Sequence, residues 1–578
     1  MTRHPIRFIF LALLLLVPGL QKASAQVIPE DPNTKERLLL HTDRDLMVAG
    51  EYLFFSAYLF NDSQDYNRQS RFAYVALRNA SGTLERVTLN LEKGEGHGAI
   101  YIHDTLSTGV YELVGFTNWM RNQGEESYFR IPIVVVNRFD ETLEAIARLS
   151  PESPADEAGP LPNAEDTSKE GLVLHAGPSR LGRRSRGSFQ LQLPGTGSGH
   201  ARVSVSIAPV ASQLVRGESW HQPKAFSQTP TRTASPYYME TEGMMLSGQL
   251  IEKGSRQGLP GARVVLNTPD TLVNFVYAET DQQGFFHFLL NDYYYHRELF
   301  LSPGPDWDGQ ELSILIDDKY LFSHPLRLPS LNGMQEITDY IRSSQDILRV
   351  KKVYGLTGYR NLEQKLVNGG TPPLLYGRAN TILYTDHYVP LDDVWEIARE
   401  LAGAWRIRRS GSQITHSLIG STTRQLLPGS PVFFVDGIMA RDIGHYMGLS
   451  SPQLYKIEIH NLKWMHGNVL FPGIIGIFSK DPEINLANLN SIYTRTSISP
   501  PIREVEFDSS TTATASLSHA NPDLRQLLLW KPEILLKKGK IEEVVFHTGE
   551  LGGEYLITVR GMTSCGKPVF ARERIYVQ

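Results

Sequence analysis

The sequence has a single cysteine, Cys565, among its 578 residues, so no disulfide can form within the chain. A chain of this length without disulfides depends on hydrophobic cores, which excludes a small, disulfide-stapled scaffold. An excess of one charge is also lacking, because 57 Lys and Arg oppose 62 Asp and Glu, which leaves a net charge of −5. We therefore expect no nucleic-acid partner, and the length alone predicts roughly three to five domains.

The motifs of common catalytic centres are missing. The sequence contains no His-Glu-x-x-His zinc motif, no Gly-x-Ser-x-Gly elbow and no phosphate-binding loop. Two histidine pairs, His97 with His103 and His460 with His466, have strand-like spacing, but neither has a third ligand nearby, which favours surface histidines over a metal site. We predict that the protein is not an enzyme and has no cofactor and no metal.

Long apolar runs are absent after the first 25 residues. Residues 1–25 combine a basic start, the apolar segment FIFLALLLLVPGL and the small residues ASA, which is the pattern of a signal peptide; an uncleaved anchor is the alternative. No later run reaches the about 20 apolar residues of a membrane helix. We expect an exported protein, in the periplasm or at the periplasmic face of the outer membrane, without a transmembrane span after signal cleavage.

Strand signals are abundant. Tyr (25) and Phe (24) occur within short alternating runs separated by Gly, Asn and Ser turns, so we predict a mainly β protein of tandem β-sandwich domains. Residues 30–138 open with HTDRDLMVAGEYLFFSAYL and close with LSTGVYELVGFTNWM, and they resemble the macroglobulin-like domain. Residues 171–214, with ARVSVSIAPV, resemble part of a second one. Residues 486–578, with GELGGEYLITVRGMTSCGKPVF, resemble the closing sandwich of macroglobulin-like proteins.

Residues 244–330 resemble the carboxypeptidase regulatory-like domain, a small seven-stranded sandwich that carries no peptidase residues. The resemblance includes the LPGA turn at residues 259–262 and the TDQQGFF segment at residues 280–286. Within it, the pattern places Val264 and Phe286 in a core. The connecting segments are of three kinds: an acidic, Pro-rich linker (139–170), a polar loop (215–243) and a helical linker (331–375).

Residues 376–485 are expected to form one small α/β domain. A helical pattern at PLDDVWEIARELAG is followed by PVFFVDG, KIEIH and VLFPGIIGIFSKD, and this order resembles the plug domain of TonB-dependent receptors. Residues 482–578 are too few for the barrel of about 22 strands that such receptors have. The chain as a whole therefore resembles exported proteins that combine macroglobulin-like, carboxypeptidase regulatory-like and plug-like domains without a barrel.

Two aromatic groups are candidate partner-binding residues. Trp464, Met465, Leu470 and Phe471 replace the polar residues usual at this point of a plug domain, and they are either core or an exposed docking patch. The second group, Tyr293, Tyr294 and Tyr295, either stacks on a ligand or closes one end of a sandwich, and the second interpretation is favoured.

Every module that the sequence resembles serves recognition or spacing. The best hypothesis is a non-enzymatic adaptor that binds an outer-membrane transporter, secretion or assembly machine. The alternative is an accessory protein that binds a glycan or peptide for TonB-linked uptake, and a third is a diverged protease inhibitor. The sequence leaves the oligomeric state open.

Overall fold

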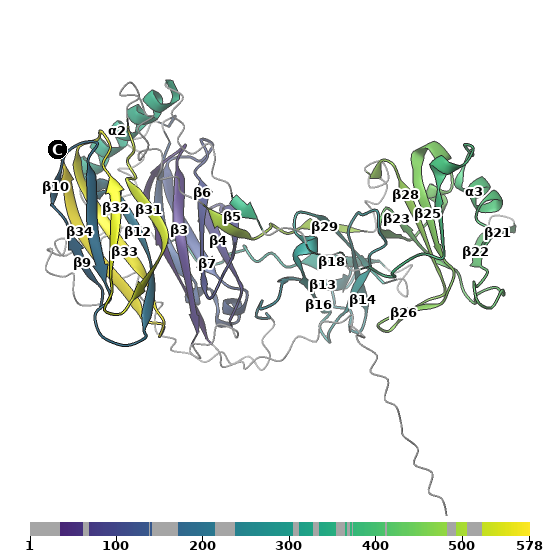
Figure 1. The fold of residues 1–578 in the computed structure, drawn as a ribbon. Coiled ribbons are helices and arrows are strands. Elements are labelled where there is room, and N and C mark those ends of the chain that lie inside the picture. The colour runs from purple at the N-terminus through teal and green to yellow at the C-terminus, as the bar shows by residue number, and fades with distance from the viewer. Residues whose placement is uncertain are drawn as a thin grey trace, which may run out of the picture.

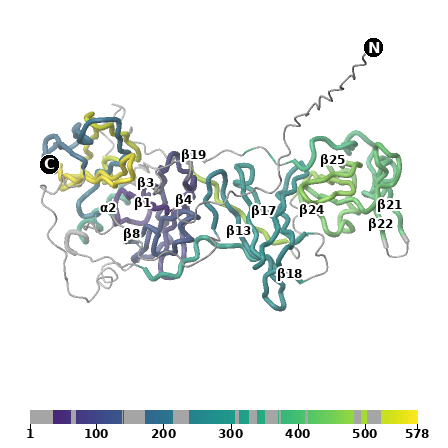
Figure 2. The backbone as a smooth tube through the Cα atoms, turned by 90° about the horizontal axis from the view of Figure 1, so that it is seen from below, coloured from purple at the N-terminus to yellow at the C-terminus, as the bar shows by residue number. Residues whose placement is uncertain are grey.

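The structure is a computed structural model of the chain. It describes residues 35–61, 69–137, 139–140, 171–213, 237–304, 311–326, 334–353, 364–366, 370, 372, 374–410, 413–482, 493–505 and 523–578. The predicted signal peptide, nearly all of the predicted acidic linker and most of the predicted polar loop lie outside these residues. Figure 1 shows four bodies in a row, which we call the second sandwich, the first sandwich, the small sandwich and the plug-like domain, and Figure 2 shows the same row from below. The prediction of a mainly β protein with tandem sandwiches is confirmed.

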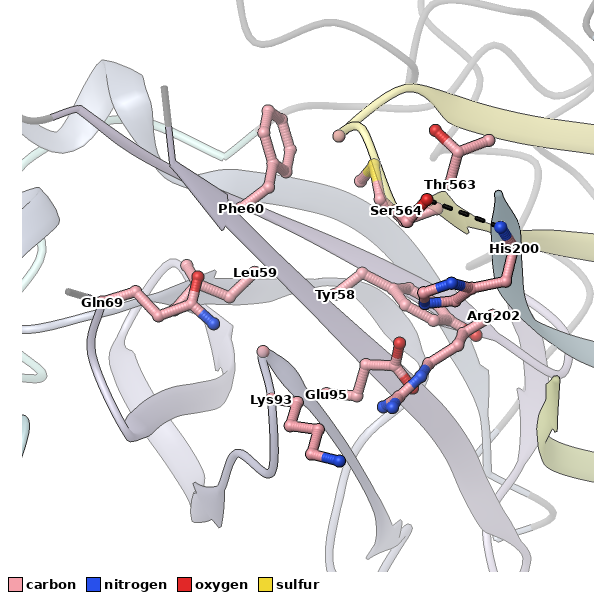
Figure 3. Close-up of a pocket in the computed structure, with 13 residues that line it drawn as sticks. Tyr58, Leu59, Phe60, Gln69, Lys93, Glu95, His200, Arg202, Thr563 and Ser564 are labelled. Atoms are coloured by element: carbon pink, nitrogen blue, oxygen red, sulfur yellow. Dashed lines mark hydrogen bonds and ion pairs between the residues drawn. The ribbon is translucent and has the colours of Figure 1, made fainter. Parts of the chain in front are cut away.

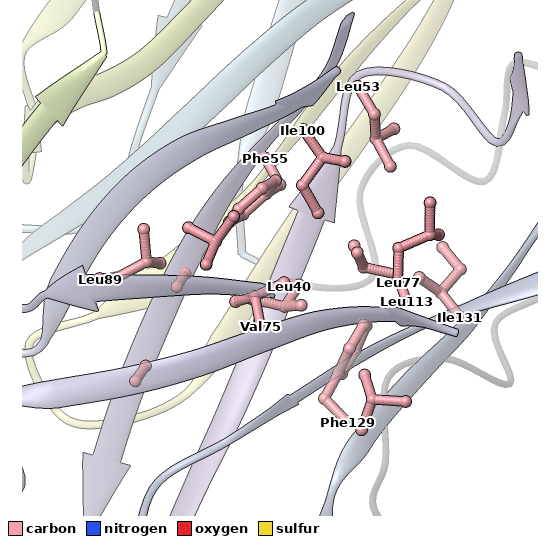
Figure 4. Close-up of a cluster of buried hydrophobic side chains, with 14 of the residues drawn as sticks. Leu40, Leu53, Phe55, Val75, Leu77, Leu89, Ile100, Leu113, Phe129 and Ile131 are labelled. Atoms are coloured by element: carbon pink, nitrogen blue, oxygen red, sulfur yellow. The ribbon is translucent and has the colours of Figure 1, made fainter. Parts of the chain in front are cut away.

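The first sandwich packs a sheet of three strands against a sheet of seven. The smaller sheet has the order β1-β3-β6 and the larger sheet the order β19-β30-β5-β4-β7-β8-β2. Alternating strand residues fill the space between the sheets (Figure 4), including Leu40, Phe55, Val75 and Leu113, which are almost fully buried. The strands are β1 (Glu36–Thr42), β2 (Leu46–Val48), β3 (Tyr52–Asn61), β4 (Phe72–Asn79), β5 (Gly82–Asn90), β6 (Glu95–Tyr101), β7 (Gly109–Phe116), β8 (Phe129–Val136), β19 (Gln364–Leu366) and β30 (Ile502–Val505).

The second sandwich is built from two distant parts of the chain. One sheet has the order β10-β34-β33-β12-β31 and the other the order β32-β11-β9. Strands β9 to β12 come from residues 173–209, whereas β31 to β34 come from residues 529–577. The strands are β9 (Val173–Ala176), β10 (Arg180–Leu181), β11 (Arg186–Gln192), β12 (His200–Pro209), β31 (Leu529–Lys537), β32 (Ile541–His547), β33 (Gly553–Thr563) and β34 (Pro568–Val577).

This pairing corrects the expected division into a partial sandwich at 171–214 and a separate closing sandwich at 486–578. Strand β12 lies between β31 and β33 and pairs with both. Its Val203, Val205 and Ile207 share one core with Val559 and Ile575 from the later segment. Each half contributes strands to both sheets and residues to the one core, and the two expected domains are therefore one.

The small sandwich has sheets in the orders β16-β13-β18 and β15-β14-β17-β29. Val264 and Phe286 are fully buried in its core, as their pattern predicts. Its last strand, β29, follows the plug-like domain in the sequence. The strands are β13 (Met244–Glu252), β14 (Arg263–Asn267), β15 (Val276–Glu279), β16 (Phe285–Leu290), β17 (Glu298–Pro303), β18 (Leu312–Ile316) and β29 (Thr494–Ser497).

The plug-like domain is a mixed sheet of order β20-β25-β28-β23-β24, covered by helix α3 (Val394–Glu400). The predicted apolar face of this helix is present, because Val394, Ile397 and Ala398 are buried in the domain core. Two hairpins, β21–β22 and β26–β27, extend from the domain. Its strands are β20 (Thr381–Tyr384), β21 (Trp405–Ser410), β22 (Gln413–Leu418), β23 (Val432–Val435), β24 (Ile438–Ala440), β25 (Leu454–His460), β26 (Trp464–His466), β27 (Val469–Phe471) and β28 (Ile474–Ser479).

The VDG motif has a structural explanation. Asp436 and Gly437 both have positive φ (47° and 84°), which suits the tight turn between β23 and β24. The Asp436 carboxylate accepts hydrogen bonds from the backbone N–H and the hydroxyl of Ser479, at 2.6 and 2.8 Å. A side chain at Gly437 would come within 2.9 Å of the Thr268 carbonyl oxygen in the small sandwich. The motif therefore joins two strands of the sheet and lies against the neighbouring body.

Charged groups fix the first sandwich to the small sandwich. Glu240 is fully buried and accepts hydrogen bonds from the Tyr74 hydroxyl (2.8 Å) and the Lys319 ammonium (2.8 Å). Nearby, Arg121 donates two hydrogen bonds to Asp317, at 2.6 and 2.8 Å. Because such buried pairs require fixed geometry, the two bodies are held in one orientation.

The chain returns to the first two sandwiches before it enters the plug-like domain. Helix α2 (Met334–Val353), within the predicted helical linker, buries Tyr340 and Ile341 against Leu46 and Val136 of the first sandwich. After the plug-like domain, strands β29 and β30 follow each other closely in the sequence. Strand β29 adds to the small sandwich, and strand β30 adds to the first sandwich. The segment at residues 493–505 therefore fastens these two bodies together.

Candidate functional site

A cleft lies between the first and second sandwiches. It includes a cavity of about 310 Å³ lined by residues of β3, β6, β12 and β31, among them Ser56, Tyr58, Glu95, Arg202 and Glu533. A smaller hollow adjoins it and continues toward the turn between β33 and β34 (Figure 3). Both hollows share Tyr58, Glu95 and Arg202 in their walls.

A tight turn positions the first-sandwich wall. Glu92 and Glu95 bond to each other through their backbones, and Lys93 and Gly94 between them have φ of 53° and 80°. Positive φ at both central residues is the geometry of a two-residue hairpin turn. A side chain at Gly94 would come within 2.7 Å of the Leu59 carbonyl oxygen, so the turn lies tightly against β3.

An ion pair crosses the cleft. The Arg202 guanidinium lies 3.2 Å from the Glu95 carboxylate, and both side chains are largely buried. Burial raises the pKa of Glu95 to about 7, although Arg202 acts in the opposite direction, and Glu533 raises it further. Burial, together with Arg202, lowers the pKa of His200. The cleft wall is therefore polar, and the raised pKa of Glu95 places its titration close to neutral pH.

The lone cysteine lies beside this cleft. Cys565 is exposed in the turn between β33 and β34, whose Thr563, Ser564 and Gly566 line the smaller hollow. The Thr563 hydroxyl lies 3.1 Å from the thiol, and this hydrogen bond is the main cause that lowers the pKa of Cys565. Across the described ranges, no group of three or more His, Cys, Asp or Glu could hold a metal ion.

The candidate residues of the plug-like domain separate into two faces of one hairpin. Trp464 is opposite Phe471 and Met465 is opposite Leu470 in the β26–β27 pairing. Phe471 is buried, with its ring centre 5.1 Å from that of Phe275 in the small sandwich. Met465 and Leu470 are 68% and 54% exposed on the other face. The hairpin therefore attaches the plug-like domain to the small sandwich and exposes only this second pair.

The three tyrosines lie elsewhere. Tyr293, Tyr294 and Tyr295 are each at most 3% exposed. Tyr293 donates a 2.6 Å hydrogen bond to Asp270, and Tyr294 belongs to the core of the small sandwich. This burial favours their interpretation as residues that close a sandwich end. They are not brought together with the 464–471 hairpin or with the cleft.

Sequence reasoning missed two features. The cleft joins residues from distant segments, and no local pattern identifies it. The second feature is an exposed run of arginines on β21, Arg406, Arg408 and Arg409. Its signal was present in the sequence as WRIRRS, a charged strand in a stretch without acidic residues.

The described residues define an extended, multidomain β protein. No protein-family model matches the chain, and no curated protein matches it. Among solved structures, the chain is similar to Escherichia coli alpha-2-macroglobulin activated by porcine elastase, at 9% identity and a TM-score of 0.23, over 94% of this chain and 44% of that one. Salmonella alpha-2-macroglobulin reacted with methylamine gives 10% identity and a TM-score of 0.22, over 94% of this chain and 39% of that one.

The chain thus spans less than half the length of these macroglobulins. The resemblance of residues 30–138, 171–214 and 486–578 to macroglobulin-like domains stays a prediction. The resemblance of residues 244–330 and 376–485 to regulatory-like and plug domains stays a prediction. No helix among the described residues is both long and apolar enough to cross a membrane.

Proposed function

We propose that this protein is an exported, non-enzymatic adaptor that binds a protein of the outer membrane, a transporter or a secretion or assembly machine, through its plug-like domain. One observation carries the proposal. Of the seventeen large apolar side chains exposed in the described residues, eight lie in residues 374–482, including Tyr388, Val389, Leu426 and Tyr455. This domain thus contains nearly half of the exposed large apolar side chains, which supports a protein-binding surface on it.

The arrangement of the four bodies supports the same proposal. The plug-like domain lies at one end of the row (Figure 1), and its 464–471 hairpin and Asp436–Gly437 turn lie against the small sandwich. The buried Glu240 cluster holds the small sandwich to the first sandwich. A domain at the end of a row of bodies in contact suits a protein that presents one binding surface at a distance from another.

Affinity purification from the native envelope in mild detergent, with mass spectrometry of what co-purifies, tests this proposal. The test variant is Tyr388→Ser with Tyr455→Ser, which removes two side chains that are 43% and 42% exposed in the plug-like domain. The matched control is Leu535→Ser with Tyr576→Ser, both 44% exposed in the second sandwich. A stoichiometric outer-membrane protein that is lost only with the test variant supports the proposal. A wild-type protein that purifies alone refutes it.

The cleft supports a second candidate function, which is binding of a polar ligand such as a glycan or peptide for uptake. A polar cavity of about 310 Å³ with an ion pair in its wall is the supporting observation. Glycan and peptide arrays with wild type and Arg202→Ala test it, and equal binding by both proteins would count against it. Protease inhibition, the third function that the sequence leaves open, stays a prediction that an elastase assay would test.

A further inference from the structure

The β21–β22 hairpin, residues 405–410 and 413–418, lies at the far end of the row (Figure 1). Arg406, Arg408 and Arg409 are all exposed, and none forms an ion pair within the described part of the chain. Residues 401–435 contain four arginines and no aspartate, glutamate or lysine, in a chain whose net charge is −5. The proposed functions do not use this concentration of positive charge.

The first residue of β21 and the last residue of β22 fix the position of the hairpin, because both pack into the core of the plug-like domain. Trp405 and Leu418, directly opposite each other, are each 1% exposed and belong to the domain core. The Trp405 indole N–H donates to His416 Nδ1 at 3.3 Å. The arginines that follow Trp405 along β21 therefore project from a strand whose position is fixed.

The outer edge of β21 can accept another strand. In the described residues this sheet has only two strands. The backbone N–H of Ile419 donates to the Ala404 carbonyl oxygen at 2.9 Å, which makes these two residues a hydrogen-bonded pair. Such pairs alternate along antiparallel strands, so the backbone groups of Ile407 and Arg409 point away from β22. An incoming strand would bond to these groups.

The side chains specify the chemistry of that strand. Arg406 and Arg408 are two residues apart and lie on the same face of β21, about 7 Å from each other along the strand. Alternate residues of an added strand have the same spacing and would face them one by one. A guanidinium binds a carboxylate through two parallel hydrogen bonds, and it can bind a phosphate in the same way, so the alternate spacing and the open strand edge, rather than the bond itself, favour an acidic peptide over a lipid surface.

We propose that the outer edge of β21 binds an extended acidic segment of the partner protein, with carboxylates at alternate positions. This inference rests on the proposed function, because it assigns the surface and the chemistry by which the adaptor holds its partner. Strand addition gives affinity through the backbone, and the two arginines give specificity for the acidic pattern.

Fluorescence anisotropy with the full chain tests the proposal directly. The first probe is a short labelled peptide with glutamate at alternate positions, and the second has the same number of glutamates in one block. We expect wild type to bind the first peptide more tightly, and Arg406→Gln with Arg408→Gln to weaken it by about tenfold or more. The control is Arg342→Gln with Arg349→Gln on α2, which removes the same charge from exposed positions.

Equal loss with the control variant, or equal binding of both peptides, would overturn the proposal, because either result indicates a general effect of net charge. Binding to vesicles of phosphatidylglycerol and phosphatidylcholine that depends on these arginines, without peptide binding, would overturn it in favour of a lipid surface. Co-purification separates the two hypotheses. If the Arg406→Gln, Arg408→Gln variant still retains the partner, this inference fails and the adaptor function stands. If wild type retains no partner, the adaptor function fails.

Discussion

The pairing of β12 with β33 can be tested by joining the two strands covalently. Val205 and Val559 are directly opposite each other and fully buried. The backbone N–H of Ser564 donates to the His200 carbonyl oxygen at 2.8 Å, which makes these two residues a hydrogen-bonded pair. Counting along the register, Val205 and Val559 form a non-hydrogen-bonded pair, whose Cα atoms approach to about 4.5 Å. Cysteines at this separation fit a disulfide.

The expected effect is large because the bond would close a loop of about 350 residues. The chain-entropy relation for cross-links gives about 6 kcal/mol of added stability for a loop of this length. The variant is Val205→Cys with Val559→Cys in a Cys565→Ser background, so that no other thiol competes. Non-reducing electrophoresis measures the cross-link, and urea unfolding with and without reductant measures the gain in unfolding free energy.

A diagonal pair provides the control. Val205→Cys with Ile557→Cys places the two cysteines about 7–8 Å apart, which is too far for a disulfide. If residues 171–213 and 523–578 belonged to two separate sandwiches, neither pair would cross-link. That result, or equal cross-linking of both pairs, would refute the described register.

Three further predictions concern two buried charged residues and the turn between β23 and β24. The pKa of Glu95 is raised from 4.5 to about 7, so the stability of the wild type should fall as pH rises from 4.5 to 7. Glu95→Gln should remove this pH dependence, which amounts to up to about 3 kcal/mol of unfolding free energy. Urea unfolding at pH 5 and pH 8 checks this, and a variant that is less stable than wild type at pH 8 would show that the pair with Arg202 outweighs burial. Lys319→Ala should cost about 3–5 kcal/mol in unfolding free energy, because it leaves Glu240 buried without its cation; the idea fails if Lys319→Ala with Glu240→Ala is no more stable than the single variant. Asp436→Ala should lower stability by about 1–3 kcal/mol in thermal melting, since two donors lose their acceptor, and Asp436→Asn should recover part of the loss.

Local sequence patterns predicted the elements better than their partners. The alternation in ARVSVSIAPV identifies β12, and the spacing of Val394, Ile397 and Ala398 identifies the buried face of α3. The same alternation does not say which strand will lie beside β12. Its partners begin at Leu529 and Gly553, and every sandwich strand of this chain offers a similar apolar face. Which strands pair over such separations depends on how all strands with similar apolar faces pack together, and no single segment contains that information.

The candidate site shows the same limit. Trp464, Met465, Leu470 and Phe471 form a short hairpin, so a two-residue period places one pair inside and the other outside. The sequence leaves core and exposed patch as alternatives for the whole group. In the structure, Phe471 and Trp464 pack against the core, whereas Met465 and Leu470 are exposed. The cleft could not be predicted, because Glu95 and Arg202 meet only after the two sandwiches have docked.

The split construction of the second sandwich sets an order on how the protein can fold. As the chain is synthesised from its N-terminal end, β12 emerges long before β31 and β33, the two strands that flank it. Until residues 529–563 are synthesised, both edges of β12 are open, and the apolar face of Val203, Val205 and Ile207 lacks the core residues that the later strands contribute. Long-range pairing of this kind is slow and exposes the chain to aggregation. The main strands of the first sandwich are synthesised early, whereas the second sandwich is complete only once β34 has been synthesised. By then the small sandwich and the plug-like domain have already been synthesised. A completed second sandwich therefore indicates that the chain between its two halves is present.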